Sequence, residues 1–260
     1  MNPRDWANRL EPALAEAERV ILSVYERAEI PRRLKADQSP VTEADHGSSR
    51  ILVQALRRLT PEIPVISEEA EWSGESVPRF WVIDPLDGTK EFIAHRGEFT
   101  MNLALIDGGK PVWGLIAVPL SGRRYVAWDR EAYRVDPDGS WHRLDPLRPP
   151  HDGLRVAASH SHPELVRVWC REQAMPIREL REAGSALKFV WMAEGAIDIY
   201  PRLRPTMAWD TAAGQILVES LGGHVRRWPL GASLTYYSDQ LVNPSFVAST
   251  PGVPVKFVGN

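Results

Sequence analysis

Apolar residues recur at three- and four-residue steps across residues 3–27, which is the spacing of one stripe along a helix. The pattern predicts a long amphipathic helix whose stripe faces a core. The stripe consists of Trp6, Leu10, Leu14, Ala17, Ile21 and Val24. A second helix is expected to begin near Thr42, which forms a capping pair with Asp45, and to run to about residue 59.

A meander of β-strands is expected in the rest of the first half, where apolar residues alternate with polar ones between turn sequences. The turn DGGK (107–110) joins the two longest strands into an antiparallel pair. The run WVI is typical of the end of a buried strand. The expected strands lie at 65–67, 81–83, 99–106, 111–118, 123–128 and 131–135. This half therefore predicts helices packed over a sheet.

A proline-rich segment, residues 145–153, follows the meander. Proline keeps the backbone extended and has no amide donor, so a domain boundary is placed there. It separates an N-terminal α+β domain, residues 1–148, from a C-terminal α/β domain, residues 149–260. In the second domain strands alternate with helices. The strands are expected near 155–159, 176–180, 196–200, 224–228 and 245–249, and the helices near 163–173, 186–195 and 209–223.

Composition excludes some classes of protein. With 260 residues, 43% of them hydrophobic, the chain suffices for one large core or two smaller ones. Its net charge of −3 gives no reason to expect a nucleic-acid polymer as partner. Cys170 is the single cysteine, and neither a signal-peptide pattern nor an apolar run of about 20 residues is present. We therefore expect a cytoplasmic protein without a transmembrane segment, either a monomer or a homodimer.

Two acids follow the buried strand at its end, where a hydrophobic core would be expected to stop. Asp84 and Asp87 could converge there with the carbonyl of Leu86, because Gly88 permits a tight turn. Clustered carboxylates repel one another unless cations or protons compensate their charge. Oxygen ligands of this kind suit Mg²⁺, whereas zinc would require cysteine or histidine. The amides and hydroxyl of Gly88 and Thr89 are donors suited to a phosphate oxygen.

Further acids occupy comparable positions elsewhere. Glu68 and Glu69 follow the strand at 65–67, and Asp210 lies at the start of a helix. Singly, such residues are typical of exposed charge or of a helix N-cap. Together with Asp84 and Asp87 they supply an acid set for two or more metal ions. His160 and His162, in the sequence SHSH, have no third histidine or cysteine nearby, so a loop and helix-start role is expected for them.

Four ordered motifs resemble one known family. VTEAD (41–45), SEE (67–69), DPLDGTKEF (84–92) and WDTAAG (209–214) are similar to the magnesium-dependent, lithium-sensitive phosphatases of the inositol monophosphatase superfamily. Further motifs resemble its 3′(2′),5′-bisphosphate nucleotidase branch, namely GEFTMNLALI (97–106), GSALKF (184–189), YPRLRPT (200–206) and NPSF (243–246). The resemblance implies a fold of the α+β or α/β class. It would be a layered α-β-α-β-α sandwich of the inositol monophosphatase/fructose-1,6-bisphosphatase type.

The resemblance also implies roles for individual residues, with two or three Mg²⁺ ions as cofactor. One ion is expected on Glu68, Asp84 and the Leu86 carbonyl, and another on Asp84, Asp87 and Asp210. Catalytic roles fall to Asp45, Thr89 and Glu68: the first two orient and deprotonate the attacking water, while Glu68 helps a third, looser ion. Gly88 and Thr89 match the phosphate cradle. Nucleotide contacts are expected from Ser185, Lys188, Tyr200 and Arg202.

The expected reaction is removal of the 3′-phosphate from 3′-phosphoadenosine 5′-phosphate to give AMP, with the corresponding phosphosulfate left open as a second substrate. Alternatives are an inositol or other sugar-phosphate phosphatase, a catalytically inactive nucleotide-binding protein, and a phosphatase of the haloacid-dehalogenase type that forms an aspartyl phosphate. The haloacid-dehalogenase type is disfavoured because the two acids of its motif lie two residues apart, whereas Asp84 and Asp87 lie three residues apart. A solvated Lys188 and an ion-paired Arg202 remain structural alternatives to nucleotide contacts.

Overall fold

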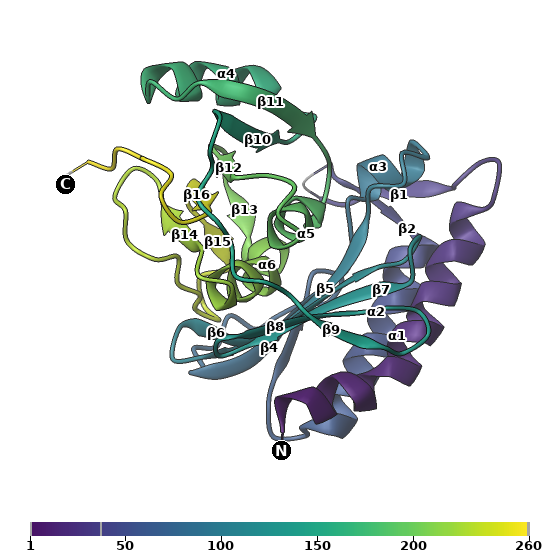
Figure 1. The fold of residues 1–260 in the computed structure, drawn as a ribbon. Coiled ribbons are helices and arrows are strands. Elements are labelled where there is room, and N and C mark those ends of the chain that lie inside the picture. The colour runs from purple at the N-terminus through teal and green to yellow at the C-terminus, as the bar shows by residue number, and fades with distance from the viewer. Residues whose placement is uncertain (1, 37, 259–260) are drawn as a thin grey trace.

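A seven-stranded sheet forms the centre of the protein, whose computed structural model describes residues 2–36 and 38–258. Its strands follow chain order across the sheet (Figure 1). All neighbours are antiparallel except the first pair. The strands are β3 (Val65–Ser67), β4 (Arg79–Asp87), β5 (Thr100–Asp107), β6 (Lys110–Val118), β7 (Arg123–Trp128), β8 (Glu131–Val135) and β9 (Trp141–Arg143). The predicted meander is confirmed.

Two long helices cover one face of this sheet, α1 (Pro3–Tyr25) and α2 (Glu43–Leu59) (Figure 1). The predicted stripe of α1 is buried except at Trp6, which is partly buried against the same cluster. At the start of α2, the Thr42 side chain and the Asp45 carboxylate cap each other's backbone amides. Both predicted helices are thus confirmed, and their apolar faces pack on Trp81 and Ile83 of β4.

The opposite face of the sheet is also buried, because α6 (Ala208–Ser220) packs on it and α5 (Leu187–Ala193) packs against α6. Side chains alternate between the two faces of a strand. Phe80 and Val82 of β4 accordingly join the cluster beneath α6, while their neighbours face α1 and α2. Burial on both sides explains why β4 and β5 have few polar positions.

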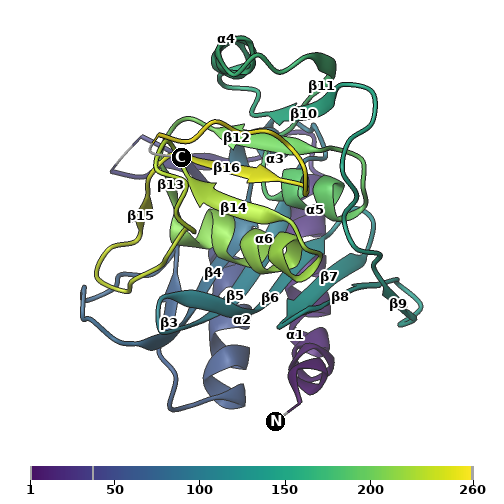
Figure 2. The same cartoon turned by 60° about the vertical axis from the view of Figure 1, so that its left-hand side comes forward.

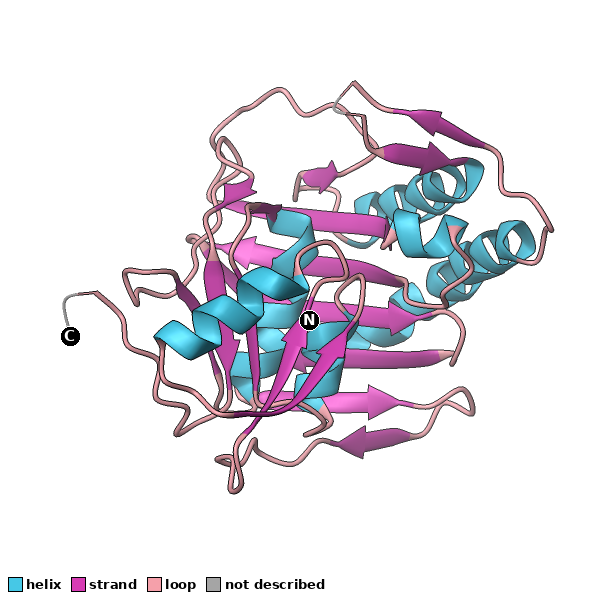
Figure 3. Cartoon of the chain, turned by 90° about the horizontal axis from the view of Figure 1, so that it is seen from above, coloured by secondary structure: helices cyan, strands magenta, loops and turns pink. Residues whose placement is uncertain are grey.

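A second, five-stranded sheet lies on the far side of α5 and α6, with α4 (Pro163–Glu172) on its outer face (Figures 1 and 2). Its order is β11-β10-β12-β16-β14, and its strands are β10 (Leu154–Ala158), β11 (Ile177–Glu182), β12 (Ile199–Arg202), β14 (His224–Arg227) and β16 (Phe246–Ser249). Figure 3 shows the same arrangement seen from above, with helices in cyan and strands in magenta. The layers therefore run α-β-α-β-α, which confirms the predicted fold.

The sequence prediction was wrong or incomplete at several short elements. β4 does not stop at residue 83 but continues to Asp87, because its pairing with β5 resumes beyond a register shift. Alternation is recognised over about four to eight residues and a helical stripe over about eleven or more, so shorter elements are missed unless other residues mark them. The elements missed for this reason are β1 (Arg32–Leu34), β2 (Pro40–Thr42), α3 (Thr89–Ile93), β9, β13 (Thr206–Met207) and β15 (Val242–Asn243).

The proline-rich linker, residues 145–153, contains no helix or strand and leads from β9 to β10. Helix α6 belongs to the second half of the chain but packs directly on β6 of the first. Gly114 permits this close approach, because a Cβ there would lie 3.0 Å from the Ala213 Cα and closer still to Ile216. The division into domains at residue 148 stays a prediction. Among the described residues, no helix combines the length and apolar character needed to cross a membrane.

Replacing Gly114 by alanine should lower the free energy of unfolding by about 1–3 kcal/mol, the usual cost of adding a methyl group to a close-packed interior. The added atom would collide with α6 at Ala213 and Ile216. Urea unfolding would measure the effect, with Val112→Ala as control, because Val112 lies on the same strand but is 39% exposed. If the Gly114→Ala midpoint equalled that of the wild type, α6 would not pack on β6 in solution.

Candidate active site

A bulge in β4 brings two of the predicted metal ligands to one side of the strand. Asp84 pairs with Asn102 and Asp87 with Thr100, so three steps along β4 correspond to two along β5. In a regular strand, residues three apart point to opposite faces, and one extra residue restores the same side. Proline fits within a bulge because it has no amide to contribute to the ladder. The DPLD sequence therefore turns both carboxylates toward one point.

Helix α6 brings the third acid from the other half of the chain. Asp210 lies in its first turn, where the carboxylate accepts a hydrogen bond of 2.8 Å from the Met207 amide. One carboxylate oxygen from each of Asp84, Asp87 and Asp210 lies within 4.8 Å of the other two. The predicted convergence of these three residues, from both sides of the linker, is thus present.

The crowded acids raise one another's pKa. Burial is the largest cause for each of them, and it raises the pKa of Asp87 to about 6 even though the nearby Lys188 ammonium opposes this. The pKa values of Asp84 and Asp210 also lie well above the usual range, because burial and the neighbouring carboxylates disfavour their charged forms. A divalent cation would relieve this repulsion, and an all-oxygen donor set without histidine or cysteine suits Mg²⁺.

Neighbouring polar residues hold Asp87 in place. Its Oδ2 accepts a hydrogen bond of 3.0 Å from the side-chain amide nitrogen of Asn102. The Thr100 hydroxyl in turn donates to the side-chain Oδ1 of Asn102 at 2.9 Å. Both supporting residues lie on β5 and are buried. The sequence analysis did not identify them. The motif GEFTMNLALI contains both residues, but their place opposite the bulge follows from strand register.

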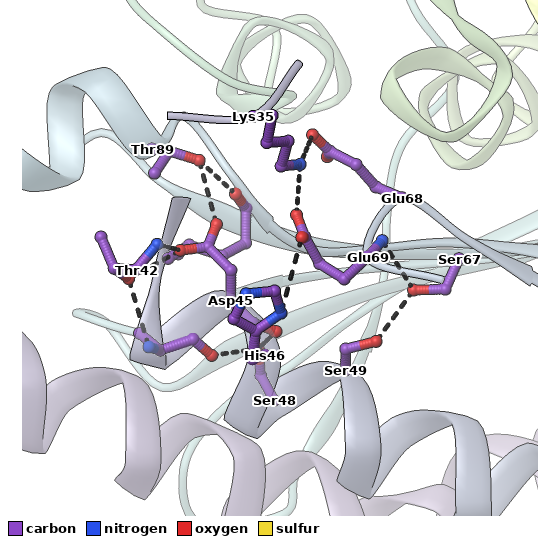
Figure 4. Close-up of polar contacts among 12 residues, drawn as sticks. Lys35, Thr42, Asp45, His46, Ser48, Ser49, Ser67, Glu68, Glu69 and Thr89 are labelled. Atoms are coloured by element: carbon purple, nitrogen blue, oxygen red, sulfur yellow. Dashed lines mark hydrogen bonds and ion pairs between the residues drawn. The ribbon is translucent and has the colours of Figure 1, made fainter. Parts of the chain in front are cut away.

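Asp45 and Thr89 form a hydrogen-bonded pair beside the acid cluster (Figure 4). The Thr89 hydroxyl lies 3.1 Å from Asp45 Oδ1 and 3.3 Å from the Leu86 carbonyl oxygen, and it can donate its proton to either. Asp45 Oδ2 accepts from the Thr42 amide at 2.7 Å and from the Thr42 hydroxyl at 2.6 Å. Burial raises the pKa of Asp45, while these hydrogen bonds oppose that shift.

Glu68 reaches the same cavity but is held by Lys35, a residue that the sequence analysis missed (Figure 4). The Lys35 ammonium, just after β1, lies 2.7 Å from Glu68 Oε1 and 2.5 Å from Glu69 Oε1. Although burial lowers the pKa of Lys35, Glu68 and Glu69 raise it above its usual value. The ion pair uses Oε1 of Glu68 and leaves Oε2 outside it, so the predicted ligand role of Glu68 remains compatible with this contact.

All of these ligand candidates line one cavity of about 460 Å³, and the predicted nucleotide contacts line the same cavity. Lys188 is only 3% exposed, so the alternative of a solvated lysine is wrong. Its ammonium donates to the carbonyls of Ala183, Gly184 and Ser185 at 2.7–2.8 Å and lies 5.2 Å from the Tyr200 ring centroid. Burial lowers the pKa of Lys188 to about 8.

Arg202 and Ser185 face the same cavity. No ion pair of Arg202 occurs in residues 2–36 and 38–258, and its buried Nε has no hydrogen-bond partner. Since Arg202 lines the cavity, its guanidinium fits an anionic ligand there. Ser185 has a φ of +49°, which is uncommon for a residue with a side chain and places it in a sharp turn.

Gly88 lies between the acid cluster and the Ser185 turn. Its φ of +92° requires glycine, and a Cβ would come within 2.6 Å of the Glu98 carbonyl oxygen. The following residue, Thr89, begins α3 and lines the cavity. All the residues that the sequence predicted for the site are thus brought around one cavity, except Asp45, which adjoins it through Thr89.

The sequence of the chain matches one family of known proteins. The Inositol monophosphatase family profile matches residues 3–250. The 3′(2′),5′-bisphosphate nucleotidase CysQ of Escherichia coli (strain K12) is 40% identical over 220 residues, covering 83% of this chain and 87% of that protein. The Salmonella typhimurium (strain LT2) protein of the same name is 39% identical over 232 residues, covering 87% and 92%.

Solved structures agree. The crystal structure of CysQ from Bacteroides thetaiotaomicron, a bacterial member of the inositol monophosphatase family, matches with a TM-score of 0.78 and 33% identity, covering 92% of this chain and 97% of that one. The extragenic suppressor protein suhB from Bartonella henselae has a TM-score of 0.77 at 23% identity, covering 95% and 94%, which shows a shared fold. From its sequence and its five-layered fold, the chain belongs to the inositol monophosphatase family.

Proposed function

We propose that this protein is a Mg²⁺-dependent phosphatase that removes the 3′-phosphate of 3′-phosphoadenosine 5′-phosphate to give AMP. The observation that carries the proposal is that one cavity is lined both by three acids within 4.8 Å of one another and by the basic side chains of Lys188 and Arg202. A bisphosphate requires both features, a metal-binding end for the scissile phosphate and positive charge for the other. The relatives named as bisphosphate nucleotidases support the same substrate class.

Asp84, Asp87 and Asp210 would hold Mg²⁺, with Glu68 and the Leu86 carbonyl completing the oxygen set. When bound, such ions would stabilise the charge that develops on a phosphoryl group and would lower the pKa of bound water. The chain's own contribution begins with Thr89. When its hydroxyl donates to Asp45, its lone pairs remain able to accept a proton from water.

Asp45 serves in this proposal as the general base behind Thr89. Burial raises its pKa, which increases its affinity for a proton. The Thr42 hydrogen bonds keep its second oxygen fixed, so that only Oδ1 faces Thr89. The exposed amides of the turn at Gly88 and Thr89 would hold nonbridging oxygens of the scissile phosphate. No covalent phosphoenzyme is needed, since the Asp45–Thr89 pair would activate water for direct attack.

Lys188 and Arg202 take different parts in holding the second phosphate. Arg202 lines the cavity, and its guanidinium can donate to a phosphate there. Lys188 already donates to three carbonyls, so its charge acts on the phosphate from behind the Ser185 turn. Ser185 and Tyr200 complete this wall. Inhibition by Li⁺ belongs to the proposal through the family resemblance alone.

Asp210→Asn should raise the Mg²⁺ concentration for half-maximal activity by at least about tenfold, because even indirect supporting contacts of a metal change its affinity by that factor. The amide oxygen can still accept from Met207, so the start of α6 is preserved. Phosphate release measured against Mg²⁺ concentration tests this, with the half-exposed Asp107→Asn as control. An unaltered Mg²⁺ dependence would remove Asp210 from the metal site.

A substrate panel should show the highest kcat/KM for 3′-phosphoadenosine 5′-phosphate, followed by its phosphosulfate, because both place an anion near Arg202. Inositol 1-phosphate has one phosphate and no anion for that wall. Phosphate release with and without Mg²⁺ and Li⁺ distinguishes these cases. A preference for inositol 1-phosphate or fructose 1,6-bisphosphate would contradict the nucleotide assignment, and no release from any of them would favour a binding protein.

Stabilisation by Mg²⁺ should grow with pH. Because the pKa of Asp87 is raised to about 6 in the folded protein, its contribution to metal-free stability falls as pH rises from about 4 through 6. Mg²⁺ binds the ionised carboxylates and offsets this loss. The increase in Tm on adding Mg²⁺ should therefore be larger at about pH 7.5 than at about pH 5, and Asp87→Asn should reduce the difference. Equal increases at both pH values would contradict the shift.

A further inference from the structure

A hydrogen-bonded pair outside the acid cluster joins the two halves of the chain at the rim of the cavity. Glu98, in the loop between α3 and β5, accepts a hydrogen bond of 2.7 Å from the ring Nε2 of His160. An ionised carboxylate only accepts, so Nε2 carries the proton. The other ring nitrogen lies 3.6 Å from Glu182. Both side chains are about three quarters buried, with exposed fractions of 23% and 24%.

The same carboxylate oxygen of Glu98 also accepts from the Gly184 amide at 3.0 Å. It thereby ties two separate loops of the second half of the chain to one loop of the first. His160 lies between Ser159 and Ser161, and Gly184 precedes Ser185. The cavity is lined by Ser159, Ser161, Gly184 and Ser185. The side chain of Glu98 therefore contacts the supports of both loops without lining the cavity itself.

The backbone of Glu98 also adjoins the phosphate turn. A Cβ on Gly88 would lie 2.6 Å from the Glu98 carbonyl oxygen and 3.2 Å from the Ser185 Cβ. Glu91 of α3 closes the same junction, since a Cβ on Gly184 would come within 2.5 Å of its carboxyl carbon. The turn at Gly88 and Thr89, the Glu98 loop and the Ser185 turn are thus in mutual contact. A shift of one therefore moves the other two.

We propose that Glu98 and His160 are positioning residues that set the affinity for the part of the substrate beyond the scissile phosphate. They fix the wall formed by residues 159–161 and 183–185 relative to the turn at Gly88 and Thr89. Neither side chain has a hydrogen bond to the acid cluster or to the water-activating pair, so we expect them to affect the binding of the nucleotide more than the rate of phosphate transfer. This inference rests on the proposed nucleotidase function, because it assigns the wall to the nucleoside and second phosphate.

Glu98→Ala should raise KM for 3′-phosphoadenosine 5′-phosphate about tenfold with kcat within about twofold, since two hydrogen bonds to an ionised group are lost. Inhibition by inorganic phosphate should keep its Ki, because that ion occupies only the metal end. Glu98→Gln should stay near the wild type, because its amide oxygen can still accept from His160 and Gly184. His160→Ala should raise KM, His160→Gln should restore it, and His162→Ala serves as the matched control from the same SHSH sequence.

Three results would overturn the inference. An unchanged KM in both Glu98→Ala and His160→Ala would show that the pair positions nothing. Parallel changes in kcat and in the phosphate Ki would place its effect at the metal end. A KM that is not restored by either conservative variant would mean a general structural defect. If the wild type prefers another phosphate ester, the proposed nucleotidase function fails separately, and the same comparison on that ester decides whether the pair sets binding. If Glu98→Ala does not fold, the His160 variants carry the test.

Discussion

Mutual repulsion among buried carboxylates is the constraint on which this structure depends. Asp84, Asp87 and Asp210 come from a strand and a helix that are over 120 positions apart in the chain, yet their oxygens lie within 4.8 Å. Such a group is unfavourable by itself, as the raised pKa values indicate. Its geometry is held by the strand bulge, by the α6 capping contact and by the close packing of α6 over Gly114. The fold keeps the acids together, and bound cations would make that arrangement favourable.

The sequence predicted the parts of the molecule that depend on regular periodicity or on short ordered motifs. The stripe of α1, the capping pair of α2 and the meander are local patterns, and the structure contains them. The bulge in β4 was not foreseen, because it depends on register with β5 and not on residues 84–87 alone. For the same reason, the motif located Asp84 and Asp87 but did not reveal Asn102.

Contacts between distant segments were the other class that the sequence could not supply. Nothing in the spacing relates Lys35 to Glu68, or Glu98 to His160, because each pair is created only when a loop packs against another part of the fold. The SHSH sequence led to a loop and helix-start role for both histidines. His162 does precede α4, whereas His160 bonds across the junction of the two halves. The two histidines therefore differ in what the folded chain places around them, and the SHSH sequence does not show this difference.

The cavity is lined by acids and by basic side chains, and this determines the order in which ligands can bind. Without cations the acids repel a phosphate, whereas Lys188 and Arg202 attract it. Once divalent ions neutralise the acids, both the metal site and the basic side chains attract anions, and a ligand with two phosphates can contact both. A single phosphate gains only one of these attractions. Discrimination between mono- and bisphosphates therefore depends on how the Ser185 turn is placed against the turn at Gly88 and Thr89, and the loops that Glu98 holds together set that placement.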